Sequence, residues 1–225
     1  MAKKEFNNIE FSDDYFVNFI NGLKTKNLEE INHIDFDDSI ILVCFYNDFE
    51  NFAKKWMNHY LSIGIKNFVL IDNNSTDNST ILLKNYKDEV NISFWKINEM
   101  DNCYRMCGWK QLIFEFYGYN RKYLTVDSDE LFIYKDYKEI LLEDFIKREK
   151  VSIIKTMMLD VYSNKNIYDS TLEDFNYVDK NTYKITTSSS YGKRFIGGPK
   201  LRVLGINSSL QKISFINYTG KEVFA

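Results

Sequence analysis

Continuous apolar stretches alternate with amphipathic stretches along the first half of the chain. Residues 39–46 are apolar and rich in β-branched side chains, which predicts a strand buried on both faces, as in a parallel sheet. Apolar residues then recur from Phe49 to Leu61 with the spacing of an amphipathic helix, and Gly64 ends that helix. This pattern predicts one β-α unit.

The alternation continues downstream. Apolar runs predict strands at residues 67–72, 92–96 and 123–126, and helical spacing predicts helices from the end of the polar loop 73–77 to about residue 86 and at 103–118. This β-α-β-α-β-α-β order predicts an α/β fold with a mostly parallel sheet. Beyond it we expect a helix near residues 138–148, a strand at 151–159, and a polar region at 163–190 with little helical periodicity.

The N-terminal residues have a different pattern. Ser12 can cap a helix through about Gly22 whose aromatic and aliphatic residues share one face. We therefore predict an N-terminal helical extension at residues 1–37 and one domain at residues 38–225, because 225 residues supply one sizeable core but not two.

The composition argues against several classes of protein. The formal net charge of −3 comes from 29 Lys and Arg against 32 Asp and Glu, which argues against bulk electrostatic binding to nucleic acid. We find no signal-peptide apolar region and no apolar run of membrane-spanning length. Cys44, Cys103 and Cys107 do not complete a zinc set, so we expect free thiols in a reducing cytoplasm.

An acidic cluster, Asp127-Ser128-Asp129-Glu130, directly follows the apolar strand at residues 123–126. In an open α/β sheet, ligands bind at the carboxyl ends of strands. Clustered carboxylates repel one another unless a cation lies among them, and oxygen ligands suit Mg²⁺ or Mn²⁺, which leave coordination positions to substrate phosphates. The cluster predicts a metal-dependent site for a diphosphate compound. The alternative is a solvated turn, in which Glu130 begins the next element.

Two further segments carry candidate chemistry. Asp72 ends a predicted strand and begins the polar loop 73–77, so its carboxylate can accept a hydrogen bond from a nucleobase or a ribose hydroxyl, or can simply cap the loop. On the helix before the acidic cluster, Arg105 and Trp109 are i,i+4 neighbours. Arg105 could offset a diphosphate charge, or could be solvated while Trp109 packs in the core.

Glycines mark a third segment, residues 197–202, whose Gly-Gly-Pro-Lys-x-Arg pattern could face a phosphate or an acceptor, or form a plain turn. It is no P-loop, because the Gly-Lys-Ser/Thr sequence is absent. No Gly-x-Gly-x-x-Gly follows the first strand, which argues against a dinucleotide-dependent oxidoreductase.

Taken together, seven segments resemble glycosyltransferase family 2 with the GT-A fold, and within it a bacterial branch that ends its motif strand in Asp-x-Asp-Glu-Leu/Phe-Phe. The matching segments are Phe45–Glu50, Trp56–Tyr60, Asp72–Asp77, Tyr104–Trp109, Asp127–Phe132, Met158–Ser163 and Gly197–Arg202. They cover about residues 39 to 220, and their order and spacing are more specific than any one of them.

The resemblance implies a GT-A-like (Rossmann-like) three-layer α/β/α sandwich with a mostly parallel central sheet. It implies a metal-dependent, inverting transfer of a sugar from a nucleotide-diphosphate sugar, with UDP-sugars favoured, to a hydroxyl of a glycan or lipid-linked acceptor. The donor-binding residues that it implies are Tyr46, Asn47, Asp48, Asp72, Asn74, Ser75, Arg105, Gln111 and Asp127. Asp127 and Asp129 would hold Mn²⁺ or Mg²⁺.

An inverting enzyme needs a general base for the acceptor hydroxyl. Asp160 follows a predicted strand and is the first candidate, with a structural role as the alternative; Asp174 and Asp179 are weaker candidates. The resemblance also implies a role in polysaccharide biosynthesis in the cytoplasm, at the inner face of the membrane through peripheral association.

One departure from the family pattern concerns the C-terminus. Related chains continue past residues 212–214 and place a His there, whereas this chain ends at Ala225. A C-terminally truncated, naturally short or degenerate member would each explain this. A nucleotide-sugar-binding protein without catalysis is therefore one alternative function. A nucleotidyltransferase is a weaker alternative, because residues 45–50 lack the expected Gly-rich basic loop.

Overall fold

The structure is a computed structural model that describes residues 28–97, 103–166, 169, 172–175, 177–178, 183–188, 192–205 and 210–220. The chain forms two compact units, residues 1–153 with 215–225, and residues 154–214. The helix predicted at residues 12–22 lies outside the described residues. Among the described helices, none combines the length and the apolar composition needed to cross a membrane.

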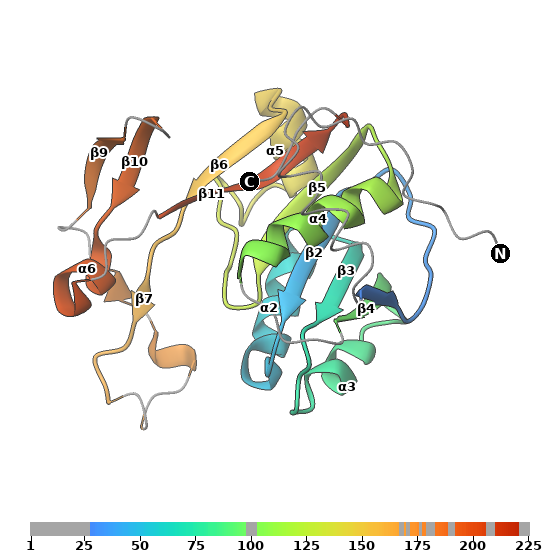
Figure 1. The fold of residues 1–225 in the computed structure, drawn as a ribbon, viewed down its shortest axis with the longest axis horizontal. Coiled ribbons are helices and arrows are strands. Elements are labelled where there is room, and N and C mark those ends of the chain that lie inside the picture. The colour runs from blue at the N-terminus through green and yellow to red at the C-terminus, as the bar shows by residue number, and fades with distance from the viewer. Residues whose placement is uncertain are drawn as a thin grey trace. The chain divides into compact units, whose positions relative to one another are not determined.

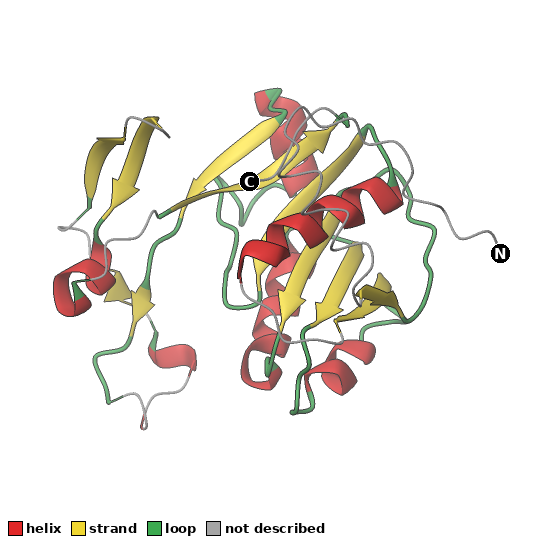
Figure 2. Cartoon of the chain, in the orientation of Figure 1, coloured by secondary structure: helices red, strands yellow, loops and turns green. Residues whose placement is uncertain are grey.

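A seven-stranded mixed sheet has the strand order β1-β4-β3-β2-β5-β11-β6 (Figures 1 and 2); β1 to β5 belong to the first unit, and the boundaries between the two units fall within β6 and β11. Its strands are β1 (Leu28–Glu30), β2 (Ile41–Tyr46), β3 (Asn67–Asp72), β4 (Asn91–Ile97), β5 (Arg121–Asp127), β6 (Ile153–Met157) and β11 (Gln211–Tyr218). The four central strands β4, β3, β2 and β5 are parallel, while β1 and β11 pair antiparallel with β4 and β5. The predicted α/β fold with a mostly parallel central sheet is confirmed.

Helices cover both faces of this sheet. They are α2 (Glu50–Ser62), α3 (Ser79–Lys84), α4 (Cys103–Tyr117) and α5 (Leu142–Glu149). Alternate strand residues such as Ile41, Val43 and Phe45 share a buried cluster with α4, which lies across one face (Figure 1). On the other face, Trp56 of α2 packs against Phe68 of β3, with ring centroids 6.2 Å apart. The result is the three-layer α/β/α arrangement.

The N-terminal boundary differs from the prediction. Leu28–Glu30 is a strand that pairs with β4, and the Phe36 side chain is buried in the core. Residues 28–37 therefore belong to the sheet unit and not to a helical extension. Within the predicted domain at residues 38–225, residues 154–214 form a compact unit of their own.

The second unit contains short elements. They are β7 (Val161–Tyr162), η2 (Leu172–Asp174), β8 (Tyr177–Val178), β9 (Lys184–Ser188), β10 (Gly192–Ile196) and α6 (Gly198–Leu204). β7 pairs with β8, and β9 pairs with β10, both antiparallel. The chain enters this unit from β6 and leaves it within β11.

Candidate functional site

Two of the residues with predicted carboxylate roles, Asp72 and Asp127, lie at the carboxyl edge of the parallel strands. In the register of the sheet, Tyr46 at the end of β2 is opposite Asp72 of β3, and Phe45 is opposite Asp127 of β5. Asp72 and Asp127 therefore flank the end of β2, roughly 10 Å apart, since each strand spacing is about 4.8 Å. Because side chains alternate along a strand, Asp72 lies on the face of Tyr46 and Asp127 on the face of Phe45, so the two carboxylates reach the carboxyl edge from opposite faces of the sheet.

Hydrogen bonds join the loop after β2 to the loop after β3. The Asp48 carboxylate accepts from the backbone N–H of Thr76 at 2.6 Å and from its hydroxyl at 3.1 Å, and the Asp48 N–H donates to Ser75 Oγ at 3.2 Å. The Glu50 N–H donates to Asp77 Oδ2 at 2.8 Å. The two loops are thus joined by hydrogen bonds into one edge of the sheet. Asp48 and Ser75, predicted to bind the donor, both take part in shaping this edge.

Asp77 caps two helices at once. Besides the Glu50 N–H at the start of α2, its carboxylate accepts the Ser79 N–H at 2.9 Å and the Ser79 hydroxyl at the start of α3. Burial raises the pKa of Asp77, but the hydrogen bonds from Ser79 and Glu50 outweigh it and hold the pKa below its usual value. The charged form of Asp77 therefore stabilises both helix N-termini.

The Asp72 loop is a tight turn closed by its own carboxylate. Asp72 Oδ1 accepts the Ser75 N–H at 2.8 Å, and Asn74 adopts a left-handed conformation with φ 59°. Asn and Asp tolerate this conformation better than other non-glycine residues, which explains the Asn-rich sequence. Asn74 and Ser75 are both half-buried in this turn.

Tyr46 and Asn47 have different surroundings. The Tyr46 side chain is buried and shares a 2.8 Å hydrogen bond between its hydroxyl and Thr80 Oγ1, and burial raises its pKa. Tyr46 thus packs beneath the Asp72 turn, and its predicted role in donor binding stays a prediction. Asn47 is exposed, and its amide donates to the Asn73 carbonyl at 2.8 Å.

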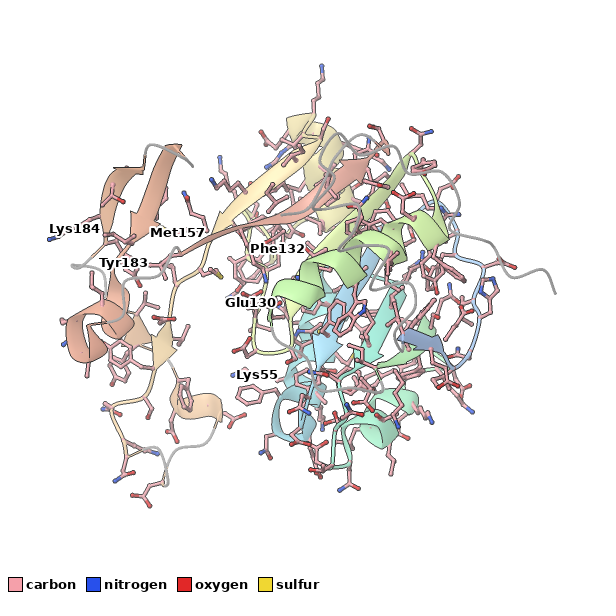
Figure 3. All side chains as sticks on the ribbon, viewed as in Figure 1. Lys55, Glu130, Phe132, Met157, Tyr183 and Lys184 are labelled. Carbon is pink, nitrogen blue, oxygen red and sulfur yellow. The ribbon has the colours of Figure 1, made fainter. Side chains whose placement is uncertain are left out.

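The acidic cluster forms a turn, and Glu130, whose side chain is labelled in Figure 3, closes it. The Glu130 carboxylate accepts the Asp127 N–H at 3.0 Å, and the Glu130 N–H donates to the Asp127 carbonyl at 3.1 Å. Asp129, at the outside of the turn, is exposed. Glu130 therefore has a structural function here, which the sequence left open.

Three aromatic side chains of α2 hold the backbone of this turn. Trp56 Nε1 donates to the Asp127 carbonyl at 3.3 Å. The Tyr60 hydroxyl donates to the Glu130 carbonyl at 3.0 Å and accepts the Phe132 N–H at 3.1 Å. His59 Nε2 donates to the Phe132 carbonyl at 3.0 Å.

Their spacing at positions 56, 59 and 60 places the three side chains on one side of the helix. This contact explains why the segment Trp56–Tyr60 accompanies the acidic cluster in the sequence. His59 is half-buried in this contact.

The helix α4 contributes a basic residue that sequence reasoning missed. Lys110 Nζ lies 3.8 Å from Asp127 Oδ1, and the Lys110 side chain is 14% exposed. The adjacent Gln111 was predicted to bind the donor, but it is buried, and its amide donates to Glu115 at 3.0 Å and to the Tyr218 hydroxyl at 2.5 Å.

Tyr218 pairs with Arg121 at the amino end of β5, so the Gln111 amide bonds toward that end of the strand and not toward the acidic turn; its role in donor binding stays a prediction. Trp109 is a core residue stacked on Phe45, which decides between the two alternatives for that side chain. The Arg105 side chain lies outside the described residues.

The carboxylates fit a metal ion only in part. No three His, Cys, Asp or Glu side chains within the described part of the chain are grouped closely enough to hold one. A second kind of metal site needs fewer protein ligands: Mg²⁺ or Mn²⁺ is bound by one or two carboxylates and completes its coordination shell with water and substrate phosphates. The half-exposed Asp127 and exposed Asp129 side chains fit this kind of site.

The predicted base, Asp160, lies in the second unit. A Cβ atom added to Gly198 would lie 3.5 Å from Asp160 Oδ2 and 3.4 Å from the Tyr183 hydroxyl, so Asp160, Tyr183 and the start of α6 are neighbours. Two segments singled out in the sequence, 158–163 and 197–202, therefore meet. Of the weaker candidates, Asp174 pairs with Lys165 at 2.7 Å, and Asp179 lies outside the described residues.

Fold and site together define an α/β protein whose sheet presents carboxylates at the carboxyl edge of its parallel strands. Neither protein-family models nor curated proteins match the chain. Among solved structures, it is similar to residues 1–349 of S. aureus TarS in complex with UDP-GlcNAc, with a TM-score of 0.43 and 16% identity over 80% of this chain and 45% of that chain.

The crystal structure of TarS 1–349 alone gives a TM-score of 0.42 and 15% identity over 81% of this chain and 47% of that one. This chain thus spans less than half the length of the solved chains that it matches. At this level of similarity the comparison does not assign a function to the chain.

Proposed function

We propose that the carboxyl edge of the sheet binds a nucleoside-diphosphate sugar and that the chain transfers the sugar to a hydroxyl of a glycan or lipid-linked acceptor. The observation that carries the proposal is the register that places Asp72 and Asp127 on either side of the end of β2, with Asp129 in a turn beside them. The order and spacing of the family segments in the sequence also support it.

In this proposal each carboxylate has a separate role. Asp72 accepts a hydrogen bond from the nucleobase, and Asp127 faces the ribose or the diphosphate. Asp129 and Asp127 would hold Mn²⁺ or Mg²⁺, which when bound supplies positive charge to the diphosphate leaving group. The hydrogen bonds between the loops after β2 and β3, together with the aromatic side chains of α2, keep these groups in place before the donor binds, so that little ordering is required on binding.

The acceptor hydroxyl needs a base, and Asp160 remains the candidate for inverting transfer. In the second unit the Asp160 Oδ2 and Tyr183 hydroxyl atoms are buried beside Gly198, while both residues as a whole are half-buried. We expect Asp160→Asn to abolish transfer while leaving nucleotide binding unchanged.

Isothermal titration with UDP, with and without Mn²⁺, tests the donor site. We expect Mn²⁺ to increase the affinity of the wild type and to have little effect on Asp129→Ala. Asp88→Ala is the matched control, because Asp88 is also exposed but precedes β4 at the opposite edge of the sheet. Equal metal dependence in the wild type and Asp129→Ala would remove Asp129 from the metal site.

Incubation with UDP-sugars then distinguishes an enzyme from a binding protein. An enzyme releases UDP by transfer or hydrolysis, and this release should disappear in Asp127→Asn. UDP binding without any release from a panel of UDP-sugars would favour the alternative of a nucleotide-sugar-binding protein without catalysis.

A further inference from the structure

A lysine ammonium is held at the same strand end as the proposed diphosphate. Lys110 Nζ lies 3.8 Å from Asp127 Oδ1, which is beyond the 2.7–3.2 Å range of a direct hydrogen bond. The Lys110 side chain is 14% exposed, whereas that of Asp127 is 42% exposed. The cation is therefore mostly shielded by protein, and the carboxylate beside it is open to the edge of the sheet.

Packing fixes where Lys110 can place its charge. On α4 its neighbours Trp109, Leu112 and Ile113 are buried, and Trp109 stacks on Phe45 with ring centroids 6.2 Å apart. Phe45 is opposite Asp127 in the sheet, so the same contact sets the position of the helix over the strand end. A lysine stem confined in this way delivers its ammonium to one place.

A cation that is shielded from water attracts an anion more strongly than a solvated one does, because the effective dielectric constant around it is lower. Lysine also binds phosphate as a point charge, without the fixed geometry that arginine requires. The loose ion pair with Asp127 satisfies this charge in the free protein, and it can be exchanged for closer contacts with phosphate oxygens.

We propose that the Lys110 ammonium binds the diphosphate of the donor, and that part of the nucleotide affinity is therefore independent of metal. This inference rests on the proposed function and adds a fixed positive charge, the Lys110 ammonium, to the carboxylates of the proposed donor site. Negative charge develops on the diphosphate as the sugar leaves, and a fixed ammonium stabilises that charge. Lys110 would then lower the barrier to transfer as well as contribute to binding.

Titration of UDP and of uridine in EDTA tests this, using the wild type, Lys110→Met and Lys110→Arg. Uridine is the internal reference, because it has the base and ribose but no phosphates. We expect Lys110→Met to weaken UDP binding about 10- to 100-fold and to leave uridine binding unchanged, as for the loss of one charged contact. Lys110→Arg should retain most of the UDP affinity because it keeps the charge.

Lys122→Met is the matched control. Lys122 is likewise partly buried and ion-paired, with Glu143, but it lies near the start of β5, at the opposite end of the strand from Asp127. We expect this variant to bind UDP like the wild type. Thermal unfolding of each variant establishes that it is folded before its affinity is compared.

The outcomes separate the two proposals. UDP affinity in EDTA that is the same in the wild type and Lys110→Met would overturn the role of Lys110 and leave the proposed function standing. An equal loss of UDP and uridine affinity would also overturn it, because Lys110 would then only support the fold of the site. A wild type that binds UDP neither in EDTA nor with Mn²⁺ would overturn the proposed function itself.

Discussion

Replacing Tyr60 by Phe tests whether α2 holds the acidic turn. The Tyr60 side chain is fully buried, and its hydroxyl makes two hydrogen bonds to the backbone of the turn, one to the Glu130 carbonyl and one from the Phe132 N–H. The substitution keeps the ring and removes only the oxygen. The phenylalanine side chain cannot accept a hydrogen bond from the Phe132 N–H in place of the lost hydroxyl.

The expected cost follows from these two groups. Phe132 is 5% exposed, so its N–H loses a partner in the interior, which costs about 1–3 kcal/mol. The Glu130 residue is only half-buried, so water can replace the hydroxyl there at a cost of about 0.5–1 kcal/mol. We expect a total of about 1.5–4 kcal/mol, which lowers the melting temperature of a chain of this size by roughly 3–16 °C.

Urea unfolding followed by tryptophan fluorescence measures the free-energy change, and a thermal scan measures the change in melting temperature. Tyr137→Phe is the control, because the Tyr137 ring also packs against His59 but its hydroxyl makes no hydrogen bond to a described residue. A stability of Tyr60→Phe within about 0.5 kcal/mol of the control would refute the reasoning, because changes of that size are typical of surface substitutions.

Two further predictions concern pH and backbone conformation. Burial lowers the pKa of His59, so the unfolded chain binds more protons below about pH 6.5 and stability falls as the pH drops; His59→Gln, which keeps a donor for the Phe132 carbonyl, should lose less stability between pH 7 and 5. His33 has the opposite effect, because its hydrogen bond with Glu30 raises its pKa. We therefore expect His33→Gln to lose more stability than the wild type as the pH falls from 7 to 5. Identical urea midpoints across this pH range in the wild type and both variants would contradict both expectations. Gly198→Ala should be more destabilising than Gly205→Ala in a thermal scan: the two φ values are +72° and +69°, so backbone strain is similar, but only at Gly198 would the new methyl group meet a ring carbon, of Tyr183 at 3.2 Å. Equal melting temperatures of the two variants would show that the ring moves aside.

Hydrophobic patterning predicted the centre of the sheet well. The observed β3 has the predicted bounds, β2 differs from its prediction by two residues at one end, and β4 and β5 differ by one or two residues at each end. These strands are continuous apolar runs because they are buried on both faces. The edge strand β1 was missed because its three residues become a strand only through pairing with β4, a contact with a distant part of the chain.

The candidate site could be predicted only in outline. The pattern placed carboxylates at strand ends, but it could not show that Asp48 and Asp77 bind the backbone of a loop or helix some 27 residues away in the sequence. On α4, buried side chains surround most of the helix, so their spacing does not define the side that faces the strand ends. The resemblance implied Gln111 at the site, whereas the residue of α4 that the structure places beside Asp127 is Lys110.

The way in which residues 154–214 join the sheet has an evolutionary consequence. β6 and β11 are neighbouring strands, and within them the hydroxyls of Thr156 and Ser214 share a hydrogen bond at 2.6 Å. Just beyond the two strands, the Met158 N–H donates to the Leu210 carbonyl at 2.7 Å. The two ends of the segment 154–214 are thus hydrogen-bonded side by side, and a short hairpin could join them equally well. Segments attached in this way can be lengthened, shortened or exchanged between relatives without disturbing the core that supports them. We therefore expect homologous chains to vary most between residues 158 and 210 and to conserve the strand ends around Asp72 and Asp127.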